Sequence, residues 1–236
     1  MSAVSTLRRW IKDRRHPLAD ALYRMAMALR GFSVPVIPGV HKALYVGYLG
    51  ARGLVASAAR VFWWTPLFQS RLTRPAPRLF LYSGLPLVLG PVRITLGADC
   101  RMSGQTTISG RTAGSTTPEL TVGRNCDIGW QTTIAVGRRI AIGDSVRLGG
   151  RNLLAGYPGH PLDPEARALG LPDTEDQVGD IVLEEGVWLA TGVTVSAGVT
   201  IGRGTVVAAG SVVTRDLPPG VLAAGAPARV VRKIVE

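Results

Sequence analysis

Cysteine and histidine are scarce in this sequence. Its 236 residues include two cysteines, Cys100 and Cys126, and three histidines, His16, His41 and His160. The cysteines lack the short paired spacing of a disulfide framework or a zinc site, and the histidines lie far apart in the chain. We therefore expect no disulfide and no metal, and the sparse thiols suit a reducing compartment.

Long apolar runs are missing as well. The charged stretch from Lys12 to Arg15 interrupts the N-terminal apolar residues, so no secretory signal pattern is present. Arg52 and Arg60 divide the helical, apolar stretch from about His41 to Trp64 into pieces shorter than the roughly 20 residues that a bilayer-spanning helix needs. We expect neither secretion nor a membrane crossing.

Acidic residues are almost absent from the first third of the chain. Residues 1–80 hold thirteen Lys or Arg and two Asp, a net charge of +11, whereas residues 81–236 hold fourteen basic and fourteen acidic residues. Such an asymmetry predicts a basic segment that binds a polyanion, either nucleic acid or an anionic membrane.

The apolar residues of this segment favour the membrane. Those from Leu18 to Leu29 recur at helical spacing, and Trp10, Trp63 and Trp64 lie near arginines, as is typical of side chains at the level of lipid headgroups. None of the familiar nucleic-acid-binding motifs is present, so we expect no nucleic acid partner.

The first domain is therefore expected at residues 1–78, a basic amphipathic helical segment that ends in the linker Thr73–Pro77. Residues 1–75 would bind an anionic membrane surface. In the alternative interpretation, these helices pack on the rest of the protein or between subunits.

A six-residue repeat begins near Leu79 and continues to Leu217, the expected second domain. In its clearest part the first position is aliphatic at Leu183, Leu189, Val195, Ile201, Val207 and Val213, and the fourth is glycine at Gly186, Gly192, Gly198, Gly204 and Gly210. One inward aliphatic residue and one turn glycine describe one side of a three-sided coil. Stacked coils form parallel β ladders, so this pattern predicts a mainly β protein built as a parallel β-helix.

The same register holds upstream, in three further coils. Their first positions are Leu96, Met102 and Ile108, then Val122, Ile128 and Ile134, then Ile142, Leu148 and Leu154. Cys100 and Cys126 occupy the fifth position, which predicts buried thiols. Insertions interrupt the coils at about residues 111–118 and at residues 155–182, and such loops can carry chemistry that a regular solenoid cannot.

The longer insertion contains Gly-His160-Pro-Leu-Asp163-Pro-x-x-Arg167, and it is followed by Gly-Val-Trp188 and by Gly-x-Pro-Ala-Arg229. With these motifs the repeats resemble the hexapeptide-repeat, left-handed β-helix acyltransferases, in particular the sugar O-acetyltransferases. The resemblance implies a homotrimer with active sites between subunits and acetyl-CoA as acyl donor. It also implies that residues 218–236 form a tail on the CoA side.

The resemblance further implies roles for single residues. His160 matches the general base, since a neutral imidazole can take the proton of a sugar hydroxyl as it attacks a thioester. The candidates for acceptor contacts are Trp188, Asn152, Gln131 and Asp163. The candidates for CoA contacts are Thr191, Ala209, Thr214, Arg215, Arg229 and Arg232. Asp163 or Glu165 could alternatively orient His160 or be an ordinary loop residue.

No serine or cysteine nucleophile motif accompanies His160, which favours direct transfer without an acyl-enzyme. We expect an O-acetyltransferase that modifies a cell-envelope glycan or lipid-linked saccharide at the cytoplasmic face of the cell membrane. Two alternatives remain at this point, an N-acyltransferase acting on an amino sugar nucleotide and a noncatalytic β-helix scaffold on the membrane.

Overall fold

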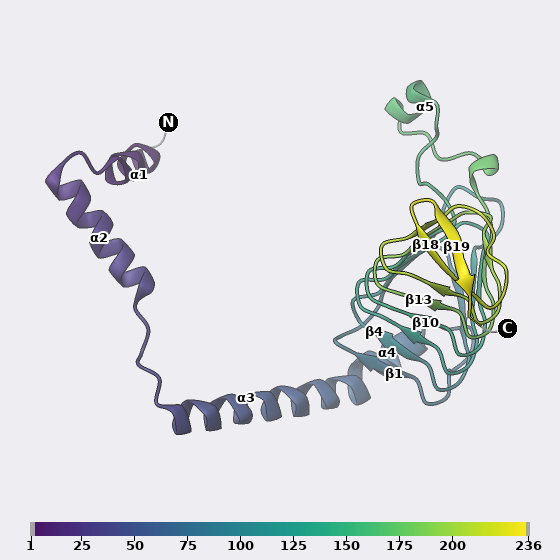
Figure 1. The fold of residues 1–236 in the computed structure, drawn as a ribbon, viewed down its shortest axis with the longest axis horizontal. Coiled ribbons are helices and arrows are strands. Elements are labelled where there is room, and N and C mark those ends of the chain that lie inside the picture. Colours follow the sequence, from purple (N-terminus) through teal and green to yellow (C-terminus); the bar gives the residue numbers. More distant parts are fainter. Residues whose placement is uncertain (1–2, 235–236) are drawn as a thin grey trace. The chain divides into compact units, whose positions relative to one another are not determined.

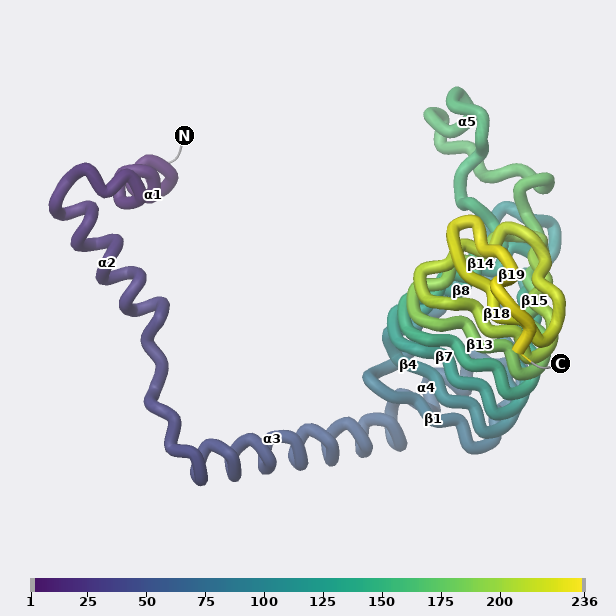
Figure 2. Tube along the Cα trace, in the orientation of Figure 1, coloured from purple at the N-terminus to yellow at the C-terminus, as the bar shows by residue number. Residues whose placement is uncertain are grey.

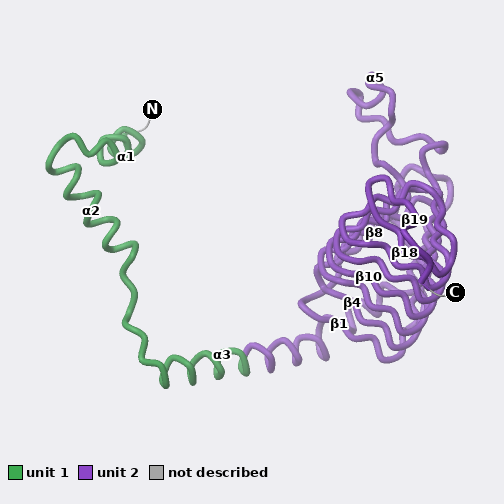
Figure 3. Tube along the Cα trace, viewed as in Figure 1, with its two compact units in different colours: residues 1–51 green, residues 52–236 purple. Residues whose placement is uncertain are grey.

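The computed structural model describes residues 3–234. The chain divides into two compact units, Met1–Ala51 and Arg52–Glu236, which Figure 3 shows in different colours. The first unit is helical, and the second contains the β-helix.

The helical unit begins with α1 (Ala3–Asp13) and α2 (Pro17–Gly31), which pack on each other through the fully buried Ala19. His16 caps α2, because its Nδ1 accepts a hydrogen bond from the Leu18 backbone N–H at 3.2 Å. The turn before α2 is further held by the ion pair of Arg14 with Asp20 at 2.8 Å. The predicted amphipathic stretch from Leu18 to Leu29 is thus helical, and α1 lies in the predicted helical segment, although no separate helix was predicted there.

A long helix crosses into the second unit. Helix α3 (Pro38–Ala59) continues through a π-helical turn, η1 (Arg60–Trp64), into α4 (Thr65–Gln69). Phe68 and Ala76 are buried in the same hydrophobic core as the β-helix, and Trp64 and Leu72 pack against that core. The predicted domain boundary at residue 78 therefore lies inside the second unit, because the segment after Ala51 closes one end of the β-helix core.

Three sheets form the β-helix, and every strand pairing is parallel except that of the last hairpin (Figure 1). Sheet 1 contains, in spatial order, β1 (Phe80–Tyr82), β4 (Arg101–Ser103), β7 (Asp127–Ile128), β10 (Arg147–Leu148), β13 (Trp188–Leu189), β16 (Val206–Val207), β18 (Val221–Gly225) and β19 (Ala228–Lys233). Sheet 2 contains β17 (Val212–Val213), β14 (Thr194–Ser196), β11 (Leu153–Ala155), β8 (Thr133–Val136), β5 (Thr107–Gly110) and β2 (Leu87–Leu89). Sheet 3 contains β15 (Thr200–Ile201), β12 (Ile181–Leu183), β9 (Arg139–Ile142), β6 (Glu119–Val122) and β3 (Arg93–Leu96).

The predicted register is confirmed. On sheet 2, Ile108 pairs with Ile134 and Ile134 with Leu154, so aliphatic residues of successive coils lie directly above one another. All first-position residues of the five predicted coils are buried. Burying one such side chain contributes about 1.5–3 kcal/mol relative to leaving it exposed, and a single coil would leave both faces of its column in water.

Three corners connect the sheets. The chain passes from sheet 1 to sheet 2 at the first corner, from sheet 2 to sheet 3 at the second, and from sheet 3 back to sheet 1 at the third. At the third corner the fourth position has positive φ in five stacked coils, at Asp99, Asn125, Ser145, Gly186 and Gly204. Short polar residues tolerate this conformation and replace glycine in the earlier coils, which weakens the repeat there without changing the turn.

The fifth position points inward, as predicted. Cys100 and Cys126 are buried free thiols, and each lies within 3.1 Å of a backbone carbonyl oxygen of the next coil, that of Gly123 and Gly143 respectively. They fill the small space beside the turn.

Both insertions leave at the second corner, residues 111–118 after β5 and the longer loop after β11. The longer loop contains α5 (Pro164–Ala168) and the 3-10 turn η2 (Glu175–Gln177), and Figure 2 shows it projecting away from the coils. The antiparallel hairpin of β18 and β19 ends the β-helix.

Candidate active site

His160 lies on the part of the long loop that projects from the coils. Its side chain is exposed and makes no hydrogen bond with another residue between 3 and 234, while its backbone carbonyl accepts a hydrogen bond from Gln177 Nε2 at 3.5 Å. Gly159 before it has a φ of +82°, so the chain turns sharply as it enters His160. The imidazole is thus free to receive a proton from a molecule outside the loop.

Asp163 has a different local role from the one expected. Its carboxylate is the N-cap of α5 and accepts a hydrogen bond from the Ala166 backbone N–H at 2.7 Å. Arg167 at the other end of this short helix donates to the carbonyl oxygens of Pro161 and Leu162. Asp163 therefore fixes the fold of the loop tip after His160.

The base of the loop is held by a buried ion pair that sequence reasoning missed. Arg111, from the shorter insertion, donates from Nε to Asp173 Oδ1 at 2.5 Å and from Nη1 to Glu175 Oε1 at 2.6 Å. These hydrogen bonds with Glu175 and Asp173 raise the pKa of Arg111. The signal available in the sequence was a lone arginine at the start of one insertion and an acidic cluster in the other.

A pocket of about 280 Å³ lies between the two insertions. Its lining includes Ser109, Thr112, Tyr157 and Gly159, and the Tyr157 hydroxyl lies 3.2 Å from the Ser109 hydroxyl. This pocket presents hydroxyl groups beside the residue that precedes His160.

Two of the expected CoA contacts lie on the first corner. Thr191 and Ala209 occupy the same position of successive coils, and two coils earlier this position is held by Trp130. A Cβ at the intervening Gly150 would collide with the Trp130 indole, so glycine leaves room for that ring. The first corner therefore presents a column of small residues beside one exposed tryptophan.

Gln131 belongs to the same corner. Its Oε1 accepts a hydrogen bond from Arg151 Nε at 3.2 Å, and the Arg151 guanidinium stacks over the Trp130 ring at 4.8 Å from the ring centroid. Gln131 is exposed and remains available to a ligand, but its neighbours are Trp130 and Arg151 and not His160.

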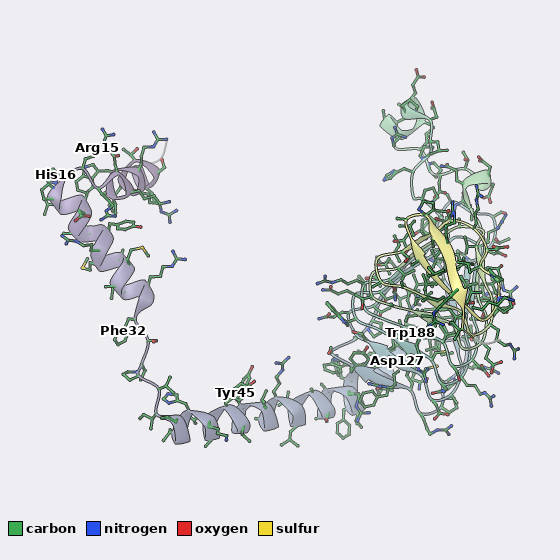
Figure 4. The ribbon with its side chains drawn as sticks, viewed as in Figure 1. Arg15, His16, Phe32, Tyr45, Asp127 and Trp188 are labelled. Atoms are coloured by element: carbon green, nitrogen blue, oxygen red, sulfur yellow. The ribbon has the colours of Figure 1, made fainter. Side chains whose placement is uncertain are left out.

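Trp188 lies on β13 with its side chain on the outer face of sheet 1, half exposed (Figure 4). It pairs with Arg147 of β10 on one side and with Val206 of β16 on the other. Asp127, which Figure 4 also labels, precedes Arg147 on the same face. The indole is thus accessible on a flat sheet face, away from the second corner.

Asn152 does not have the expected environment, and this candidate is corrected. Its side chain is 1% exposed, its Nδ2 donates to the Gly149 carbonyl at 2.8 Å, and its Oδ1 accepts from the Val193 backbone N–H at 2.7 Å. Both ends of the amide are used inside the β-helix. Asn152 therefore joins two coils and cannot reach an acceptor.

The four remaining candidates are exposed. Thr214 and Arg215 follow β17 at the second corner, two coils beyond the base of the His160 loop. Arg229 and Arg232 lie on β19, and each donates to a neighbouring backbone carbonyl of the same strand. Their positive charges have no carboxylate partner among residues 3–234 and suit phosphate groups.

These residues do not converge within one chain. Sheet 2 separates the first corner, with Thr191 and Ala209, from the second corner, with His160. The structure brings together Thr191 and Ala209, and it brings the His160 loop together with Arg111. Among residues 3–234, no group of three or more His, Cys, Asp or Glu side chains could hold a metal ion.

Comparison with known proteins places the chain in a structural class. Residues 180–215 match the bacterial transferase hexapeptide family, described by six repeats. Over 113 residues the chain is 39% identical to the galactoside O-acetyltransferase of Escherichia coli strain K12, which covers 48% of this chain and 53% of that protein. The chain thus spans about half the length of this curated relative.

A solved structure of an N-acyltransferase supports the fold. AntD, an N-acyltransferase from Bacillus cereus in complex with dTDP and 3-hydroxybutyryl-CoA, is 16% identical, with a TM-score of 0.55 over 71% of this chain and 86% of that one. A hexapeptide-repeat acetyltransferase from Vibrio cholerae is 22% identical, with a TM-score of 0.47 over 72% and 79% of the two chains. The second unit of this protein is a left-handed β-helix of hexapeptide repeats, the fold of the hexapeptide-repeat acyltransferases.

Proposed function

We propose that this protein is an acetyl-CoA-dependent O-acetyltransferase that modifies a sugar hydroxyl, with His160 as general base. The observation that carries the proposal is an exposed imidazole, without a side-chain hydrogen bond to residues 3–234, on the long loop of a hexapeptide β-helix. The 39% identity to a galactoside O-acetyltransferase supports the choice of a sugar hydroxyl as acceptor.

In the proposed reaction, His160 takes the proton of the acceptor hydroxyl as the oxygen attacks the thioester carbon of acetyl-CoA. A C–O bond forms, the C–S bond breaks, and the proton returns from the imidazole to the CoA thiolate. The acetyl group moves directly to the sugar, because no serine or cysteine nucleophile lies in the loop that carries His160.

The arrangement of candidates supports a site between two copies of the chain in a homotrimer. His160 and the small-residue column of Thr191 and Ala209 lie on opposite edges of sheet 2, so one chain offers the base and a neighbour can offer the donor groove. The exposed cations Arg215, Arg229 and Arg232, the last two in the tail of residues 218–236, would bind the phosphates of CoA. Trp188 and Gln131 remain candidates for contacts with substrate.

The helical unit is proposed to bind the cytoplasmic face of the cell membrane, where the acceptor would be a cell-envelope glycan or lipid-linked saccharide. Leu18, Met25 and Leu29 of α2 are exposed apolar residues, and α1 carries exposed arginines. Such a helix pair can lie in the headgroup region of an anionic bilayer. None of the helices between residues 3 and 234 is long and apolar enough to cross a membrane.

The test is transfer from acetyl-CoA to a panel of neutral saccharides, compared between the wild-type protein and His160→Ala. A positioned base contributes about 10²–10⁴ in rate, so the variant should lose that factor while keeping its fold, because His160 lies outside the core. Leu169→Ala, which changes an exposed side chain of the same loop, is the matched control and should retain full activity.

Other results would redirect the proposal. Transfer only to an amino sugar nucleotide would favour an N-acyltransferase. The absence of CoA binding would favour a noncatalytic scaffold. A folded His160→Ala protein with wild-type turnover would remove His160 from the role of base.

A further inference from the structure

The two insertions at the second corner are joined by charged side chains, Arg111 in the shorter one and Asp173 in the longer one. Arg111 and Asp173 are separated by 62 residues in sequence, and both side chains are 3% exposed. We propose that Arg111 and Asp173 are positioning residues that hold the loop at Gly159 and thereby place His160 for proton transfer. This inference rests on the proposed function.

Arg111 organises one short segment of the long loop. Besides its bonds to the carboxylates of Asp173 and Glu175, its Nη2 donates to the Asp173 backbone carbonyl at 2.9 Å. The planar guanidinium thus binds both ends of Asp173, which a lysine could not reproduce, since its ammonium lacks the fork of donors. The backbone N–H of Arg111 is itself fixed to the β8 carbonyl of Val136 at 2.9 Å.

The organised segment in turn holds the backbone on both sides of His160. Asp173 Oδ2 accepts a hydrogen bond from the Gly159 backbone N–H at 3.0 Å. Gln177, four residues after Asp173, donates to the carbonyl oxygen of His160. Gln177 is fixed by a reciprocal capping box with Thr174. The peptide groups before and after His160 are therefore both tied to residues 173–177.

Among residues 3–234, no other contact constrains Gly159 with comparable strength. An added Cβ at this glycine would meet no atom within 4 Å, and its φ is positive, so neither packing nor backbone sterics fixes its orientation. The hydrogen bond that the Gly159 N–H donates to Asp173 is the contact that selects one direction for the chain as it enters His160. When this bond is lost, the loop can keep its α5 tip while the imidazole moves relative to the donor groove.

A buried pair of charges contributes little net stability to the attachment of a loop, because the desolvation of both groups offsets much of the attraction between them. In general, well-packed apolar side chains can replace a buried ion pair without loss of stability. What the pair adds is direction, since two hydrogen bonds from Arg111 hold Asp173, and its second carboxylate oxygen then accepts a hydrogen bond from the Gly159 backbone N–H. This favours a role in placing a functional group.

The experiment compares Arg111→Gln, Arg111→Lys and Asp173→Asn with the wild-type protein in acetyl transfer to a saccharide acceptor. A displacement of about 1 Å at a reacting group can lower the rate about 100-fold, so we expect kcat to fall by about 10–100-fold with the KM for acetyl-CoA within about twofold. Arg111→Lys and Asp173→Asn should fall less than Arg111→Gln.

Two further measurements separate positioning from general destabilisation. In the His160→Ala background, Arg111→Gln should lower the residual rate no further, because the pair acts through His160. Hydrogen exchange of the peptide that contains Gly159 and His160 should accelerate in the Arg111 and Asp173 variants. Arg124→Gln is the matched control, because Arg124 pairs with Asp144 at 3.0 Å at the third corner and should change neither rate nor loop exchange.

The inference is overturned if folded Arg111→Gln keeps wild-type kcat, or if it lowers the residual rate of His160→Ala by the same factor as in the wild type. It is also overturned if exchange of the loop is unchanged in every variant. If the wild-type protein transfers no acetyl group, the proposed function fails, while accelerated exchange would still show that the pair anchors the loop.

Discussion

Replacing Asn152 by alanine provides a direct test of whether this residue serves the fold or the acceptor. Asn152 lies at the fifth position of its coil, where its amide connects the Gly149 carbonyl to the Val193 backbone N–H of the next coil. Alanine keeps the backbone geometry and removes both hydrogen bonds. The substitution should therefore lower the stability of the β-helix and leave the binding of an acceptor unchanged.

The expected loss in unfolding free energy depends on which hydrogen bonds the Val193 N–H and the Gly149 carbonyl keep in the variant. The Val193 N–H is buried and would have no partner, which costs about 1–3 kcal/mol. The Gly149 carbonyl keeps a long contact from the Thr132 hydroxyl at 3.4 Å, so its lost bond adds about 0.5–1.5 kcal/mol. The free energy of unfolding should fall by about 1.5–4.5 kcal/mol in total.

The assay is urea denaturation followed by circular dichroism, together with steady-state kinetics of the folded protein. Thr191→Ala is the stability control, since its exposed side chain should change the unfolding free energy by no more than about 0.5 kcal/mol. A folded Asn152→Ala protein of unchanged stability with a strongly raised KM for the acceptor would refute the structural role that we assign to Asn152.

Three further predictions concern the β-helix, two on its core and one on a corner ion pair. Ile134→Ala, between two aliphatic neighbours of its column, should lower the unfolding free energy by about 2–5 kcal/mol in the same denaturation experiment. The Cys126 thiol, whose pKa is raised by its hydrogen bond with Cys100 and by burial, should react with a thiol reagent only after unfolding; fast reaction of the native protein would contradict this. The pKa of Asp144 is lowered by hydrogen bonds from the Arg124 backbone N–H and guanidinium. The ionised carboxylate therefore stabilises the fold above about pH 4, and this stabilisation is lost as the pH falls through the folded-state pKa. Asp144→Asn should weaken the acid dependence of the melting temperature.

The β-helix could be predicted in register because one rule governs every coil. An aliphatic first position and a small fifth position must both point inward, so the sequence alone aligned Ile108 with Ile134 and Leu154. The same rule also indicated the true place of Asn152, because the fifth position that buries Cys100 and Cys126 buries its amide as well. Treating Asn152 as an acceptor contact overlooked that register.

The boundary at residue 78 was wrong for a related reason. Composition and charge changed there, but the core of the β-helix needs a cover at its first coil, and the four-residue spacing of Trp64, Phe68, Leu72 and Ala76 supplies apolar side chains to it. Basic charge on the outside of a segment and burial of its apolar side are compatible. A net charge therefore cannot locate where a core ends.

The sequence predicts only part of how the two insertions meet: their common corner, but not the contact between their side chains. Both insertions follow the third strand of a coil, after Ile108 and after Leu154, so a repeat register alone predicts that they leave the β-helix at the same corner. It does not predict that Arg111 turns inward to Asp173, because that choice depends on the path of loops that follow no repeat. Regular coils fix where loops begin, and the chemistry of the loops then depends on contacts between them. In this protein such a contact holds the backbone beside the exposed His160, because the Gly159 N–H donates to the Asp173 carboxylate, and the hexapeptide pattern does not constrain either residue.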